Sequence, residues 1–153
     1  MDSQGRLVLR FDDDGDGTGK LLVQANSNGF CGKGSAWFSG ATIQDFADAI
    51  AVFPIPEEKS PKIAGGFYKK DGSGEFAQEH FALTVYPIDH RGHIGFQVRI
   101  ATELWNEERP ESQQEVKLEI ITSYEPLAQF SRQLKALVEG RIKEVILDAD
   151  LLP

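Results

Sequence analysis

Residues 81–100 read FALTVYPIDHRGHIGFQVRI, and this stretch decides the fold class. Large apolar side chains recur at every second position over 81–86 and again over 94–100, as they do in strands that bury one face. Between these two runs, His90-Arg91-Gly92 has the composition of a turn. The stretch therefore predicts a β-hairpin, whose two strands pair antiparallel.

Weaker alternation on both sides of this hairpin predicts further strands. Residues 6–11 and 20–26 are expected to form a second hairpin with a long polar tip over 12–19. The Asn28-Gly29 pair is a turn signal, and it leads to a short strand at 35–38. The other expected strands are residues 62–68, 116–120 and 142–147.

Two segments have the 3.6-residue spacing of amphipathic helices. The first is expected to begin with the capping-box-like run Thr42–Asp45 and to end near Phe53, because Pro54 cannot continue it. The second is expected to begin after the cap residue Ser123 and to end at Gly140. The predicted buried stripes are Ile43, Phe46, Ala47, Ile50 and Phe53 in the first helix, and Leu127, Phe130, Leu134, Leu137 and Val138 in the second.

These elements predict one α+β domain that spans residues 1–153. Seven or eight strands that come mostly in hairpins should form a largely antiparallel sheet. Each helix must bury one apolar stripe, and the simplest arrangement places both helices on one face of that sheet. A chain of 153 residues buries enough surface to fold without a disulfide or a metal.

Charge and composition argue against several classes of function. The net charge is −8 and the 16 basic residues are spread along the chain, so no basic block is available to neutralise nucleic-acid phosphates. No apolar run approaches the roughly 18 residues of a membrane helix. The first residues lack the basic and apolar regions of a secretory signal, and Cys31 has no partner for an internal disulfide. We therefore expect a cytoplasmic protein that binds neither nucleic acid nor membrane.

The polar tip at residues 12–17 matches the start of a calcium loop. Its carboxylates at Asp12, Asp14 and Asp16 have the spacing that such a loop requires. Val23 stands where the loop needs a bidentate Glu, and the flanking segments are expected to be strands instead of helices. We interpret the run as a solvated hairpin tip and keep a weak calcium-binding module as an alternative.

Two other motifs are incomplete in the sequence. Residues Gly29–Ser35 suggest a phosphate-binding loop, but Gly34 follows Lys33 and Ser27 stands where the first glycine is needed. Glycines that let strands turn explain the segment better. Cys31 has no activating base in a recognisable motif, so we expect a partly buried structural thiol.

The histidines and carboxylates leave an enzyme open as an alternative. Asp89, His90 and His93 form part of a metal site, but a closed zinc site needs about four ligands and His80 would have to come from elsewhere on the sheet. An enzyme would have to assemble its site from distant strand residues, with His80, Glu103 and Asp89 as the first candidates. The sequence contains no complete set of catalytic, cofactor-binding or metal-binding residues.

The order of elements resembles a known group of proteins. A hairpin is followed by Gly29-Phe30 and Trp37-Phe38, then by the first helix, and the run Tyr124–Phe130 opens the last helix. In this order the chain resembles small uncharacterised bacterial proteins, among them the WapI-like immunity proteins of polymorphic-toxin systems. The resemblance spans most of the chain and brings no catalytic residues. It implies a cytosolic protein that binds and blocks a partner toxin.

We therefore expect a non-enzymatic protein-binding module, specifically an immunity-type inhibitor. An acidic inhibitor suits a basic toxin domain, because complementary charge speeds the encounter of two proteins. Trp105, beside the charged loop at 107–113, has two interpretations. An exposed tryptophan there would mark a contact surface, and a packed one would cover a sheet edge.

Overall fold

The computed structural model describes residues 5–105 and 107–150, and over these residues the chain is an α+β protein. The described residues form eight strands, two α-helices and one turn of 3-10 helix at Pro110–Ser112. The strands are β1 (Arg6–Asp13), β2 (Thr18–Ser27), β3 (Phe30–Ser39), β4 (Lys62–Tyr68), β5 (Phe76–Pro87), β6 (His93–Ala101), β7 (Glu115–Ser123) and β8 (Val145–Asp148). The α-helices are α1 (Gly40–Ile50) and α2 (Tyr124–Val138).

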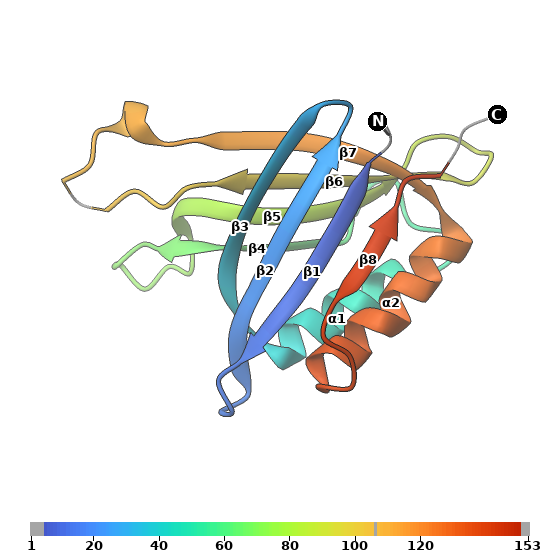
Figure 1. Cartoon of the computed structure of the whole chain (residues 1–153), viewed down its shortest axis with the longest axis horizontal. Coiled ribbons are helices and arrows are strands. Elements are labelled where there is room, and N and C mark those ends of the chain that lie inside the picture. Colours follow the sequence, from blue (N-terminus) through green and yellow to red (C-terminus); the bar gives the residue numbers. More distant parts are fainter. Residues whose placement is uncertain (1–4, 106, 151–153) are drawn as a thin grey trace.

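The strands are antiparallel throughout, as predicted, but they form two sheets instead of one. Sheet A has the order β3-β2-β1-β8, and sheet B has the order β4-β5-β6-β7. The split follows α1 and the loop after it, which carry the chain away from β3 before β4 begins. Figure 1 shows the strands of sheet A crossing in front of those of sheet B.

Glycines in β3 let the two sheets approach closely where they cross. A Cβ at Gly34 would lie 2.4 Å from the Cγ2 atom of Ile100, and one at Gly32 would lie 2.5 Å from a methyl of Val116. Both separations are far below van der Waals contact, so larger residues would push the sheets apart. The glycines between Gly29 and Ser35 thus serve packing as well as the turn.

The two helices pack on each other and against both sheets, beside the crossing of the sheets (Figure 1): α1 contacts β3 and β4, and α2 contacts β1, β7 and β8. The ring of Phe96 in β6 lies 6.4 Å from that of Phe46 in α1 and 5.4 Å from that of Phe130 in α2. The hydroxyl of Ser131 in α2 donates a 2.6 Å hydrogen bond to the carbonyl of Ala47 in α1. The predicted stripes of both helices are buried except for Phe53 and Val138.

The boundaries of α1 differ from the prediction at both ends. The helix begins two residues earlier, because the hydroxyl of Ser39 accepts a 3.1 Å hydrogen bond from the amide of Thr42 and caps it. It ends at Ile50, and Phe53 is 75% exposed. Phe53 precedes Pro54, a position at which helical backbone is disfavoured.

The second helix and the thiol also differ in detail from what was expected. Ser123 is the N-cap of α2, but its hydroxyl donates to the carboxylate of Asp150 instead of accepting a helix amide. The strand β3 begins at Phe30, so Cys31 lies inside it. Cys31 is exposed, and the expectation of a partly buried thiol was wrong. No described helix combines the length and the apolar character that crossing a bilayer requires.

Candidate binding surfaces

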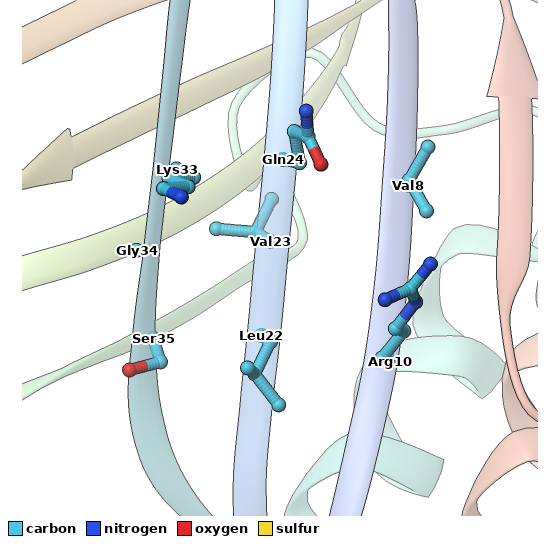
Figure 2. A pocket seen from close by; sticks show the side chains of 8 residues that line it. All are labelled: Val8, Arg10, Leu22, Val23, Gln24, Lys33, Gly34 and Ser35. Atoms are coloured by element: carbon cyan, nitrogen blue, oxygen red, sulfur yellow. The ribbon is translucent and has the colours of Figure 1, made fainter.

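The outer face of sheet A is the first surface that the fold leaves uncovered. Strand alternation points Leu7, Leu9, Leu21 and Val23 inward and leaves the residues between them on the outside. Figure 2 shows these outward side chains on β1, β2 and β3, around a shallow depression of about 480 Å³. Val8, Leu22 and Val23 are its apolar lining residues, and Arg10 and Lys33 line it as well.

The register of sheet A aligns four outward apolar residues across its strands. Trp37 lies opposite Lys20, so it is diagonal to Leu22, and Val8 lies opposite Gln24, so it is diagonal to Leu22 on the other side. Val8 lies opposite Ile146 in β8. We call Trp37, Leu22, Val8 and Ile146 the apolar stripe. Trp37 is 58% exposed and Ile146 is 40% exposed.

Cations flank the apolar stripe. Arg10 contacts Glu144 at 2.8 Å and Arg6 contacts Asp148 at 2.7 Å. Lys20 and Lys33 form no ion pair with any residue of the described part of the chain. The outer face of sheet A therefore has four basic side chains and three acidic ones. The basic ones are Arg6, Arg10, Lys20 and Lys33, and the acidic ones are Asp12, Glu144 and Asp148. The chain as a whole has a net charge of −8.

The second surface is an aromatic groove of about 530 Å³ at one end of sheet B. It is built from the end of β4, the start of β5 and the loop after β6. Its aromatic residues are Phe67, Tyr68 and Trp105, and Leu104, Lys69 and Lys70 also line it. The ring of Phe67 lies 4.9 Å from the ring of Trp105, and Trp105 remains 62% exposed.

Gln78 holds the backbone that carries Trp105. Its side-chain amide nitrogen donates a 2.7 Å hydrogen bond to the carbonyl of Leu104, and its side-chain oxygen accepts one of 3.0 Å from the amide of Leu104. The glutamine side chain thus pairs with loop backbone as a neighbouring strand would. Glu108 closes the loop from the other side, where its carboxylate accepts a 3.1 Å hydrogen bond from the amide of Trp105.

His80 supports this arrangement from beneath. Its Nε2 atom lies 2.7 Å from the side-chain oxygen of Gln78, and because that oxygen only accepts, Nε2 carries the hydrogen. The ring of Phe67 packs edge-on against His80 at 4.6 Å, and His80 is 2% exposed. Burial lowers the pKa of His80, with Arg99 acting in the same direction and the nearby charge of Glu103 opposing it. Neutral His80 is a buried member of a hydrogen-bonded network.

The structure separates the three residues considered for an enzyme. His80 and Glu103 are close enough for the carboxylate to affect the imidazole. The end of β5 at Pro87 is about 23 Å from His80 at roughly 3.3 Å per residue, and Asp89 lies beyond that end. There it contacts Nδ1 of His93 at 2.5 Å, and this hydrogen bond lowers the pKa of Asp89 to about 2.

The three carboxylates considered for calcium are not gathered around one point. Asp12 is part of β1, and Asp16 accepts hydrogen bonds from both the amide and the hydroxyl of Thr18. Val23 is buried in β2. Among the residues with described positions, no group of three or more His, Cys, Asp or Glu side chains is placed to hold a metal ion.

The segment at Gly29–Ser35 is a tight turn followed by a strand. Asn28 and Gly29 both have positive φ, at 53° and 89°, as the favoured two-residue hairpin turns require. Lys33 projects from the outer face of sheet A. The sequence did not point to Gln78, Phe67 or Tyr68, although the aromatic pair Phe67-Tyr68 at the end of a strand was a visible signal.

Comparison with known proteins adds no further assignment. No protein-family model matches this chain, and neither the curated proteins nor the solved structures contain a match to it.

Proposed function

We propose that this protein is a non-enzymatic protein-binding module, in particular an immunity-type inhibitor, and that the aromatic groove is its main contact surface. The observation that carries the proposal is Trp105, which is 62% exposed on a backbone that Gln78 and Glu108 hold in place. Tryptophan is among the residues that dominate the binding energy of protein interfaces.

Fixed backbone around Trp105 favours binding because it reduces the entropy lost on association. A side chain on a mobile loop would have to be ordered by the partner, at a cost of roughly 0.5–1.5 kcal/mol for each immobilised side chain. Here the hydrogen bonds to Leu104 and the contact with Phe67 order the groove before any partner arrives.

The charge of the loop beside the groove favours a basic partner, whereas the groove itself is lined by Lys69, which is paired with Glu75, and by Lys70. The chain carries −8, and Glu103, Glu107, Glu108 and Glu111 follow one another along the loop that presents Trp105. Arg109 in the same loop is offset by Glu111 at 3.9 Å. Negative charge beside an aromatic contact surface attracts a basic domain and accelerates its association. This fits the toxin partner that the resemblance to immunity proteins implies.

The positions of the reactive side chains support a binding role over turnover. His80 is buried and its Nε2–H is used by Gln78, so it is not presented to a substrate. Asp89 and His93 are paired with each other at the other end of β5. Cys31 is exposed on β3, and none of its cross-strand neighbours is a histidine.

The two exposed tryptophans provide a test with an internal control. The chain would be used as bait, the captured protein purified, and its affinity measured by calorimetry against the wild type, Trp105→Ala and Trp37→Ala. We expect Trp105→Ala to weaken binding by about 30-fold, equivalent to about 2 kcal/mol, and Trp37→Ala to leave this affinity almost unchanged. Expression of the captured protein alone should arrest growth, and co-expression with the wild-type chain should restore it.

Two results would contradict the proposal. One is capture of no protein partner together with robust turnover of a small molecule by the purified chain. The other is a captured partner whose affinity is the same for Trp105→Ala as for the wild type, which would remove the groove from the interface.

A further inference from the structure

We infer that the outer face of sheet A is a second docking surface, and that it binds an acidic amphipathic helix of a protein partner along the apolar stripe. This surface belongs to the other sheet and shares no residue with the aromatic groove. The inference therefore goes beyond the proposed function and does not depend on it.

The shape of the stripe favours a helix over an extended peptide. A strand laid across a sheet face would leave its own backbone N–H and C=O groups without partners, whereas a helix satisfies these groups internally. The stripe has two diagonal steps of about 7–8 Å and one direct step of about 5 Å, so it is about 20 Å long. That length corresponds to about 13 residues of helix at 1.5 Å per residue.

The placement of the charges indicates that the helix is acidic on both flanks. In the register of sheet A, Lys33 lies on one side of the stripe, and Lys20 and Arg10 lie on the other. Figure 2 shows Lys33 and Arg10 on opposite sides of Leu22. Arg10 already contacts Glu144, and Lys20 lies opposite Asp12 in the register. Lys33 lies opposite Gln24 and forms no ion pair within the described residues, so a carboxylate of the partner would meet a cation there that is not already neutralised. A basic helix would be repelled by the same side chains.

The test uses a synthetic helical peptide of about 15 residues with a leucine stripe flanked by glutamates. The protein would carry Trp105→Phe, so that Trp37 is the only tryptophan left and reports directly on the stripe. We expect the peptide to shift the emission of Trp37 to shorter wavelength, and its affinity to fall as ionic strength rises. A peptide with lysines in place of the glutamates should not bind.

Charge-reversal variants locate the site. Lys20→Glu combined with Lys33→Glu should weaken binding of the acidic peptide by about tenfold or more, and Leu22→Ser by several-fold. Lys117→Glu is the matched control, because Lys117 is an exposed strand residue of sheet B, and it should change nothing. Circular dichroism of each variant checks that the fold is retained. If the double charge-reversal variant does not fold, the milder double variant Lys20→Gln with Lys33→Gln is used in its place.

Several outcomes would overturn the inference. The first is equal binding of the acidic and the basic peptide, and the second is the same loss of affinity in Lys117→Glu as in the double reversal. Comparable binding of a short single-stranded DNA of the same charge would reassign the face to nucleic acid. Retention of peptide binding in Trp105→Ala separates this surface from the aromatic groove, so failure here leaves the proposed function standing.

Discussion

Trp37 and Trp105 are exposed to almost the same extent, at 58% and 62%, yet they occupy different kinds of surface. Trp37 projects from the regular ladder of β3, and its neighbours across the strands are set by register alone. Trp105 lies outside the strands, against the ring of Phe67, on backbone that a glutamine from another strand holds. One surface is a consequence of strand pairing, and the other is built by side-chain hydrogen bonds.

The comparison shows that exposure by itself does not define a contact site. The backbone of a strand is fixed by its pairing with neighbouring strands. No further interaction is needed to order the backbone that carries the outward side chains. A loop must be fixed by other means, and here Gln78 and Glu108 provide them. Changes to Gln78 should therefore loosen the aromatic groove and leave the apolar stripe unaffected.

Among the changes that would separate the two surfaces, Gln78→Ala should have the largest effect on stability. The change would leave the backbone of Leu104 and the Nε2–H of buried His80 without their partner, at a cost of about 2 kcal/mol in the free energy of unfolding. Urea denaturation would measure the loss of stability, and in a Trp37→Phe background a drop in the emission anisotropy of Trp105 would report the looser loop.

Gln24→Ala is the matched control for that prediction. Gln24 is an exposed outward residue of β2 on the other surface, and its removal should change stability by less than about 0.5 kcal/mol. If Gln78→Ala were as mild as Gln24→Ala, the hydrogen bonds to Leu104 would not be what orders the aromatic groove.

The same contrast explains what the sequence could predict. Alternation placed Leu22 and Trp37 in strands, and helical spacing identified the buried stripes of α1 and α2, because these patterns depend on neighbours in the chain. The two-sheet arrangement depends on Gly32 and Gly34 meeting Val116 and Ile100, residues that are far apart in sequence. No local pattern encodes such a crossing.

The aromatic groove was beyond local pattern for a related reason. Gln78 and Leu104 are separated by 26 residues, and a glutamine in a strand gives no sign that it will pair with loop backbone. Trp105 was singled out in the sequence only because a tryptophan beside a charged loop is unusual. Two interpretations of it were left open, a contact surface and packing on a sheet edge. The carboxylate of Glu108, in the same charged loop, accepts a hydrogen bond from that tryptophan's amide.

A smaller effect, specific to the aromatic groove, should appear in the pH dependence of stability. Because burial lowers the pKa of His80 in the folded state, the unfolded chain binds a proton at this residue more readily than the folded chain does. The free energy of unfolding contributed by His80 is therefore fully present above about pH 6.5 and falls as the pH drops towards the folded pKa.

Chemical denaturation at a series of pH values between about 5 and 8 would measure this slope. His80→Gln should flatten it, because the glutamine carries no titrating group. His90→Gln is the control, since His90 is exposed on the turn after β5, and it should leave the slope as in the wild type. If the slope persisted in His80→Gln and disappeared in His90→Gln, the pH dependence of stability would come from His90, and the prediction for His80 would be wrong.

The smallest expected effect is on stability when each tryptophan is removed. Trp37→Ala should change the free energy of unfolding by less than about 0.5 kcal/mol, because Trp37 packs against no aromatic ring of residues 5–105 and 107–150 and its backbone ladder does not depend on its side chain. Trp105→Ala should cost about 1 kcal/mol more, because it removes the contact with Phe67 at 4.9 Å and exposes that ring. Equal costs in urea denaturation would mean that the contact between Trp105 and Phe67 does not stabilise the fold. The side chain of Trp105 would then be no better ordered than that of Trp37, and the packing argument for the groove as the main contact surface would be lost.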